Sequence, residues 1–169
     1  MNDGVMLNVG GESVSLLDVA GINMDGVDAV RFTRTAAGFF VFQIKDAKLG
    51  TIGKDDNKKF AAQFELEIKN VISLKDEKET ADKWVGKTHN ENFTISGENM
   101  LEDIGRIKAF FEDTGFKGSG NLEQLLQACK GHLFQGQVTH RPDKNDKDTI
   151  YANINRDPKV LKPFDPAAV

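Results

Sequence analysis

Lysine and arginine side chains recur near aromatic residues in this sequence, on or beside segments whose pattern is typical of β-strands. The residues that we single out are Arg31, Arg34, Phe39, Lys54, Lys58, Lys59, Trp84, Lys87, Arg141, Lys144, Tyr151 and Arg156. Cationic side chains follow the phosphates of a nucleic-acid strand, and flat rings stack on unpaired bases at about 1–3 kcal/mol per base. The combination predicts a cationic groove for single-stranded nucleic acid, in which Trp84, Tyr151 and Phe39 stack on bases.

Motifs for catalysis are weaker. Residues 81–88 match a relaxed phosphate-binding loop. A true phosphate loop joins a buried strand to a helix, whereas here the preceding segment is charged and the following one looks extended. Glu65 and Glu67 project from one face of a predicted strand and could form a carboxylate pair. Alternating polar residues on a half-exposed strand account for them without a catalytic role. We therefore expect no enzymatic activity and no cofactor.

Candidate metal ligands are also few. The spacing of Cys129, His132 and His140 offers three ligands, but Cys129 falls on the apolar stripe of a predicted helix, which favours a buried core residue. Residues 143–148 are acidic like a calcium loop, yet two lysines interrupt them, and the glycine and distal glutamate of such a loop are missing. The sequence predicts a solvated turn there and no metal site.

Charge is distributed unevenly along the 169 residues. The whole chain holds 22 basic and 26 acidic side chains, a net charge of −4. Residues 1–30 contain five acidic side chains and no Lys or Arg, which leaves a net +1 for the remaining residues. This asymmetry predicts an acidic, Gly-rich N-terminal arm with one short strand near residues 5–9, attached to a near-neutral body.

Composition points to a folded protein of a reducing compartment. The apolar fraction is 39%, with twelve Phe, and the single Cys excludes an intramolecular disulfide. Apolar runs are far shorter than the roughly 20 residues of a membrane span, and the first thirty residues lack the features of a signal peptide. We expect a cytoplasmic protein that does not enter the membrane.

Two adjacent segments alternate with period two. Residues 38–49 and 60–69 place apolar and polar side chains on opposite faces, with a Gly/Asp/Asn-rich loop between them. This pattern predicts a long antiparallel hairpin. Residues 84–95 favour a third strand that contains Trp84 and Lys87.

The second half of the body predicts two helices and two more strands. Ser96 is a candidate N-cap for a helix that ends at Gly115, and Asn121 is one for a helix over residues 122–130. Strands follow at 133–140 and 149–155. The α+β order β-β-β-α-α-β-β is that of an OB-fold, a five-stranded antiparallel barrel. We predict an OB-like domain at 31–156, after the arm at 1–30 and before a Pro-containing tail at 157–169, which is a poor core element.

The chain resembles phage-encoded single-stranded DNA-binding proteins, and related phage proteins of replication and recombination clusters. The segments that carry the resemblance are residues 36–44, 64–68, 122–131, 136–138 and 151–156. The resemblance implies an OB-type barrel that coats single-stranded DNA in the cytoplasm of an infected host cell, without catalysis. Many such proteins recruit replication partners through an acidic C-terminal tip, but residues 162–169 are hardly acidic, and the acidic segment here is N-terminal.

Two other functions stay open from the sequence. The body could serve assembly as a virion or scaffold protein, with both terminal segments tying neighbouring subunits together. Alternatively, the acidic arm could mimic DNA and inhibit a host enzyme. The preference for DNA over RNA, replication or recombination protein partners, and homo-oligomer formation are likewise undecided by the sequence.

Overall fold

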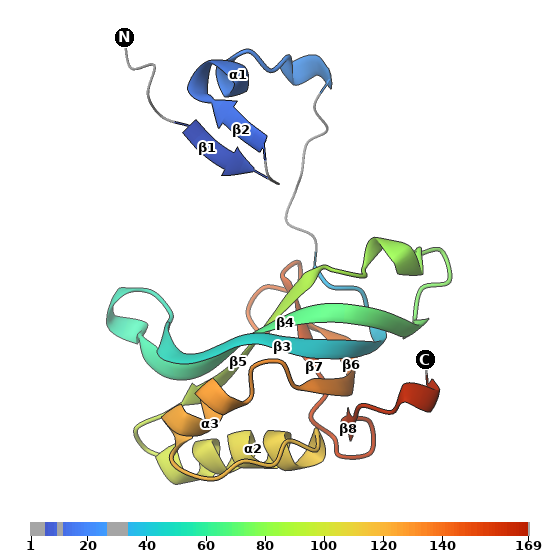
Figure 1. The fold of residues 1–169 in the computed structure, drawn as a ribbon. Helices are drawn as coiled ribbons and strands as arrows, with labels where there is room; N and C mark the ends of the chain where they lie inside the picture. Colours follow the sequence, from blue (N-terminus) through green and yellow to red (C-terminus); the bar gives the residue numbers. More distant parts are fainter. Residues whose placement is uncertain (1–5, 10–11, 27–33, 169) are drawn as a thin grey trace. The chain divides into compact units, whose positions relative to one another are not determined.

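The structure is a computed structural model that describes residues 6–9, 12–26 and 34–168 (Figure 1). The chain divides into two compact units, Met1–Thr33 and Arg34–Val169. We call the second unit the body and describe each unit by itself.

The N-terminal unit contains more structure than the single strand that we predicted. Strand β1 (Met6–Val9) pairs antiparallel with β2 (Glu12–Ser15), and helix α1 (Leu16–Ala20) and the 3-10 turn η1 (Met24–Gly26) follow. Ser15 and Asp18 cap α1 reciprocally, since each backbone N–H donates to the other side chain, at 2.9 and 3.2 Å. These bonds satisfy amide groups at the helix start, and they lower the pKa of Asp18.

The predicted hairpin is confirmed and forms the centre of the body. Strand β3 (Gly38–Ile52) pairs antiparallel with β4 (Lys59–Leu74) along almost its whole length. The apolar positions that alternate in the sequence, Phe40, Phe42 and Ile44, are fully buried. Burying one face of the hairpin fixes its register, because a slip of one residue would turn these side chains to the opposite face.

The sheet has six antiparallel strands, and the mainly β, α+β class is confirmed. Its order is β5-β4-β3-β6-β7, formed with β5 (Thr88–Ile95), β6 (Leu133–Pro142) and β7 (Ile150–Ile154), and β8 (Lys162–Pro163) also pairs with β6. Among the described residues no backbone ladder joins β5 to β7, so the sheet is not closed into a barrel.

Strand β5 begins four residues later than predicted. Trp84 follows the 3-10 turn η3 (Ala81–Lys83), and the Gly86 N–H donates to the Ile68 carbonyl at 2.8 Å. Gly86 has φ +83°, a conformation that side chains disfavour. This turn keeps Trp84 and Lys87 out of the strand, and their predicted strand position is wrong.

Helices α2 (Met100–Asp113) and α3 (Leu122–Ala128) cover one face of the sheet (Figure 1). Asn121 caps α3 as predicted, because its side chain accepts from Gln124 N and the Gln124 side chain accepts from Asn121 N, both at 2.9 Å. Ser96 is not the N-cap of α2, which begins only at Met100. Instead, the Ser96 N–H and hydroxyl both donate to Asp103 at 2.8 Å.

Phenylalanine rings fill the space between helices and sheet. Phe110 lies 5.1–5.4 Å, between ring centroids, from Phe64, Phe93 and Phe134. The C-terminal segment completes this core, because Leu161 is 2% exposed. The prediction that the tail is a poor core element is therefore wrong at Leu161. The nearby Pro163 pairs with Phe134 of β6 at the edge of the sheet, where a missing backbone N–H is tolerated.

The described helices are too short or too polar to cross a lipid bilayer. The longest of them, α2, has 14 residues, against about 20 for a membrane span.

Candidate nucleic-acid interface

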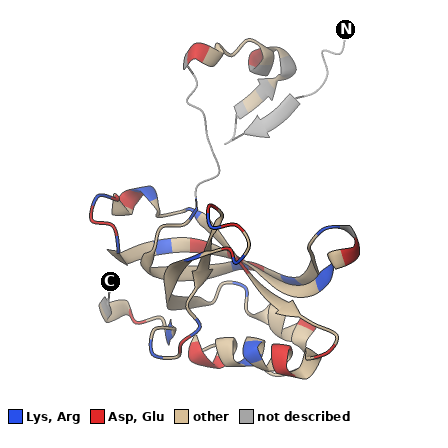
Figure 2. Ribbon diagram, turned by 180° about the vertical axis from the view of Figure 1, so that it is seen from behind, with Lys and Arg blue, Asp and Glu red and all other residues tan. Residues whose placement is uncertain are grey.

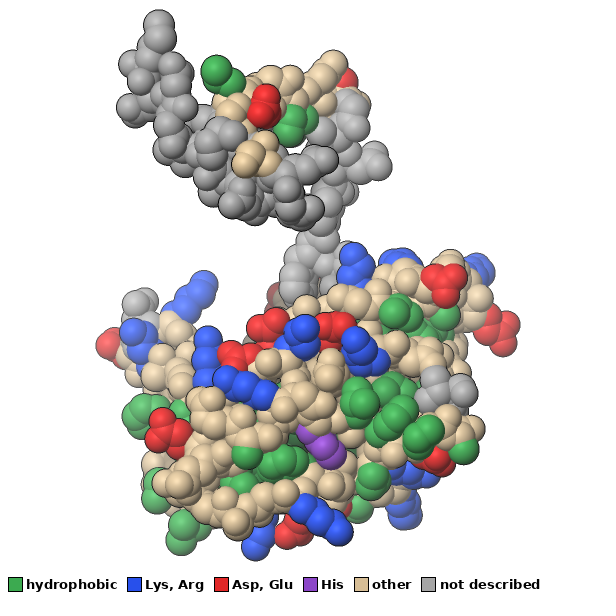
Figure 3. Space-filling view, viewed as in Figure 1, with side chains coloured by type: hydrophobic (Ala, Val, Ile, Leu, Met, Phe, Trp, Pro, Cys, Tyr) green, Lys and Arg blue, Asp and Glu red, His purple; other side chains and the backbone are tan. Residues whose placement is uncertain are grey.

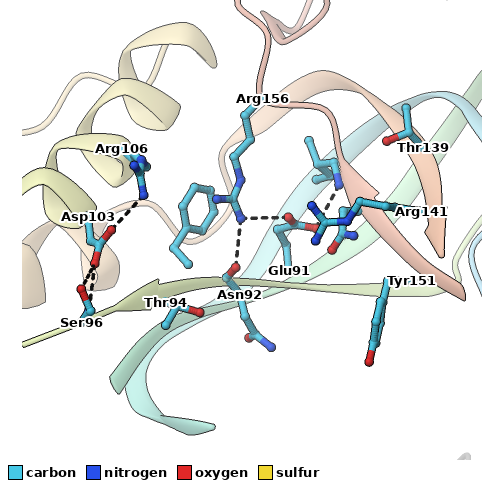
Figure 4. A pocket seen from close by; sticks show the side chains of 13 residues that line it. Glu91, Asn92, Thr94, Ser96, Asp103, Arg106, Thr139, Arg141, Tyr151 and Arg156 are labelled. Carbon is cyan, nitrogen blue, oxygen red and sulfur yellow. Dashed lines mark hydrogen bonds and ion pairs between the residues drawn. The ribbon is translucent and has the colours of Figure 1, made fainter. Parts of the chain in front are cut away.

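A solvent-open groove of about 760 Å³ lies between β5, β7 and the first turns of α2 (Figure 4). The polar side chains on its walls come from β5, α2, β6 and β7 or from residues just after these elements. They include Arg106, Arg141, Arg156, Tyr151, Asn92 and Asn153. Three of these, Arg141, Tyr151 and Arg156, belong to the set predicted from the sequence, and the fold brings them together.

Arg156 lies directly after β7, and its side chain reaches across to β5. Its guanidinium group lies over the Phe93 ring, 3.7 Å from the ring centroid. Its Nη2 donates to Glu91 Oε1 at 3.2 Å and to the Asn92 carbonyl at 2.9 Å. The side chain is nevertheless 42% exposed. Arg156 is therefore held firmly, but remains accessible from the groove.

Glu91 is a buried carboxylate that connects the two ends of the open sheet. Its Oε2 accepts from the Ile154 N–H of β7 at 3.0 Å and lies 3.1 Å from His89 Nε2. His89 Nδ1 lies 2.9 Å from the hydroxyl of Thr35, where the described body begins. Glu91 and His89 are only 2% and 4% exposed. Side-chain contacts thus join β5 to β7 where a backbone ladder is missing.

Arg141 and Tyr151 form a cross-strand pair on β6 and β7, at the other end of the groove. Tyr151 is 46% exposed, which confirms its predicted outward position. A hydrogen bond with Asp143 raises the pKa of the Tyr151 phenol. The pKa of Asp143 is lowered chiefly by the hydrogen bond from the Asn145 backbone N–H, and next by the hydrogen bond from the Tyr151 hydroxyl. The Asp143 contact orients the phenol and leaves the ring exposed to the groove.

Arg106 projects from α2 and completes the cationic lining. It donates to Asp103 at 2.9 Å and to Glu102 at 2.7 Å. Hydrogen bonds from the Ser96 backbone and hydroxyl, with the charge of Arg106, lower the pKa of Asp103. Sequence reasoning missed Arg106, because its spacing to Glu102 is that of an ordinary exposed helical ion pair.

Trp84 does not contribute to an interface. Its side chain is 4% exposed and belongs to the buried core. Lys83 lies over the ring, 5.2 Å from the centroid, and Trp84 Nε1 has no partner among the described residues. A base cannot reach this ring, so the stacking role predicted for Trp84 is corrected.

The other predicted residues lie outside the groove lining. Lys54, Lys58 and Lys59 are exposed at the tip of the β3–β4 hairpin, seen as blue segments in Figure 2. Three more predicted residues are placed separately. Lys87 precedes β5, Lys144 lies in the β6–β7 loop, and Arg34 is half-buried at the start of the body.

Phe39 is half-buried and lines a separate cavity of about 420 Å³ beside β4 and β6. It does not meet Tyr151 in the groove. Arg31, the remaining predicted residue, lies outside the described residues.

Three lysines on or beside β3 and β4 form ion pairs. Glu67 accepts from Lys45 and Lys69, both at 3.0 Å, and Asp46 pairs with Lys130 at 3.0 Å. Figure 3 shows the resulting mixture of blue and red side chains across the middle of the body. Ion pairing does not separate this face from the groove, because Arg106 and Arg156 are paired too. The groove differs in adding the exposed ring of Tyr151.

The candidate metal ligands are dispersed. Cys129 is fully buried, which confirms its predicted core role, and burial raises its pKa to about 11. His132 Nε2 and His140 Nε2 lie 2.7 Å from the carbonyls of Thr114 and Thr35, respectively. In the part of the chain that the structure describes, no three metal-binding side chains gather at one point.

The chain matches no protein-family model and no curated protein.

Proposed function

We propose that this chain is a non-enzymatic single-stranded DNA-binding protein with an OB-like body, acting in phage DNA replication or recombination. The observation that carries the proposal is the groove that gathers Arg106, Arg141, Arg156 and Tyr151. Single-stranded nucleic acid is bound by such a combination of phosphate-contacting cations and accessible flat groups. The resemblance to phage proteins adds the biological setting.

The lining of the groove supports a strand of nucleic acid over a small neutral ligand. This lining holds three arginines and two carboxylates, Glu91 and Asp103, and Arg141 is the arginine among them that forms no ion pair with the described residues. The groove is open to solvent, so a polymer can enter and leave it. Amide and hydroxyl groups between the arginines can bond to base edges or phosphates without demanding one sequence.

The OB-like part of the proposal rests on strand order. Strand β3 pairs with both β4 and β6, and the two ends of the order, β5 and β7, meet through Glu91. An OB barrel is itself only partly closed. The α2–α3 segment lies between β5 and β6, as the predicted helical insert does.

Fluorescence anisotropy with an end-labelled oligodeoxythymidylate of about 20 nucleotides tests the function. A label is needed because Trp84 is buried and would report binding poorly. We expect binding that weakens steeply between roughly 50 and 200 mM salt, with weaker binding to duplex DNA. Absence of binding at low salt would refute the proposal.

Arg141→Ala tests the groove itself. Loss of one charge-assisted phosphate contact should weaken binding by about tenfold. Lys117→Ala is the matched control, since it removes one exposed positive charge from the α2–α3 loop, outside the groove. Equal effects of both variants would indicate that general charge, and not the groove, attracts the strand.

Two further measurements separate the alternatives. A labelled RNA of the same sequence establishes the preference between DNA and RNA. Sedimentation without nucleic acid tests the scaffold function, which predicts large oligomers and no affinity for oligonucleotides.

A further inference from the structure

We propose that Arg156 presents the plane of its guanidinium group to an unpaired base, and that Glu91 is the positioning residue that holds this plane in the groove. The inference rests on the proposed function and assigns to these two residues the contact with bases. Arg141 then has the different task of contacting phosphate.

One nitrogen of the Arg156 guanidinium is already occupied. Nη2 donates to both Glu91 Oε1 and the Asn92 carbonyl, so this donor is not free for phosphate. One face of the group covers the Phe93 ring at 3.7 Å. The side chain is 42% exposed in the groove, so the opposite face is accessible to a ligand. Figure 4 shows the Arg156 side chain with its dashed contacts to Glu91 and Asn92.

Glu91 cannot turn away from Arg156, because its second oxygen is fixed. Oε2 accepts from the Ile154 N–H and faces His89, inside a region where Glu91 is 2% exposed. A fixed, buried carboxylate neutralises much of the arginine's charge and sets its orientation. Arg141, by contrast, forms none of the ion pairs found among the described residues.

The chemistry follows from this difference. Unpaired bases stack on the planes of arginine guanidinium groups as well as on aromatic rings. A base above Arg156 would extend the stack that Phe93 begins below it. An arginine whose charge is matched internally gives little counterion release, so it should add base-dependent affinity without adding much salt dependence.

Two probes of equal length separate these roles. One is the labelled oligodeoxythymidylate, and the other is the same deoxyribose-phosphate chain without bases. Arg156→Lys keeps the charge and removes the plane. We expect it to weaken binding of the thymidylate probe by about tenfold, in line with the loss of one stacked base, and to leave the abasic probe within about twofold. Arg141→Ala should weaken both probes by similar factors.

Glu91→Gln tests the positioning role. It keeps the size of the side chain and frees Arg156 from its counter-charge. We expect weaker thymidylate binding together with a steeper salt dependence, by up to about 0.7 in the slope of log K against log salt, because the released arginine can now reach a phosphate. A residue that served the fold alone would leave the slope unchanged. If Glu91→Gln does not fold, Glu91→Asp, which withdraws the carboxylate by one carbon, takes its place.

Distinct results would overturn the inference. Equal losses on both probes for Arg156→Lys would make Arg156 a phosphate contact, and a wild-type salt slope in the folded Glu91 variant would remove the positioning role. In both cases, binding of the thymidylate probe by the wild-type protein would still support the proposed function. If the wild-type protein binds neither probe, the proposed function fails and this inference fails with it.

Discussion

Replacing Glu91 with alanine should destabilise the body by about 3 kcal/mol. The change leaves the buried Ile154 N–H without its acceptor, which costs about 1–3 kcal/mol. It also leaves Arg156 without its carboxylate. Removing one partner of a fully buried ion pair costs about 3–5 kcal/mol. Arg156 is 42% exposed, so water can solvate its charge and only part of that cost is expected here.

The assay is thermal and urea unfolding followed by circular dichroism. For a chain of this length, about 3 kcal/mol corresponds to a Tm lower by about 6–12 °C. Glu65→Ala is the matched control, because it removes an exposed glutamate from the neighbouring strand β4, and its Tm should stay near that of the wild type. A loss below about 1 kcal/mol for Glu91→Ala would refute the view that this side chain joins β5 to β7.

Two other predictions concern the C-terminal segment and acid stability. Leu161→Ala should cost about 2–3 kcal/mol in urea unfolding, because it empties a buried leucine site, whereas Pro166→Ala on the exposed end of the same segment should change little. The lowered pKa of Asp103 contributes stability that is present above the pKa of an unfolded Asp, about 3.9, and is lost as the pH falls through the folded value. Asp103→Asn should therefore lower stability at neutral pH and flatten its acid dependence, and an unchanged pH profile would contradict this assignment.

The locally encoded parts of the fold were predictable. The alternation of apolar and polar residues in β3 and β4 predicts a half-buried hairpin, because successive side chains of a strand point to opposite faces. Asn121 indicates the start of α3, because an N-cap side chain bonds to a backbone N–H only two or three residues further on. Gly115, with φ +76°, ends the α2 region as predicted, since few other residues adopt that conformation.

Burial was not predictable residue by residue. Trp84 has the residue type of a stacking platform, but a 3-10 turn and a positive-φ glycine place it in the core. Leu161 stands between prolines, yet it belongs to the buried core together with residues from distant segments. Which apolar side chain enters a core depends on the volume left by all the others.

The sequence by itself determined the central hairpin, the helix boundaries near Asn121 and Gly115, and the cationic and aromatic residues from which an interface can be built. Only the tertiary structure decided that Arg106, Arg141 and Arg156 share one groove, while the hairpin lysines lie elsewhere. It also decided the role of Glu91, which bonds to Ile154 and Arg156, 63 and 65 residues further along the chain. Such contacts depend on how the strands pair in space, and side-chain periodicity carries information only about neighbours along the chain.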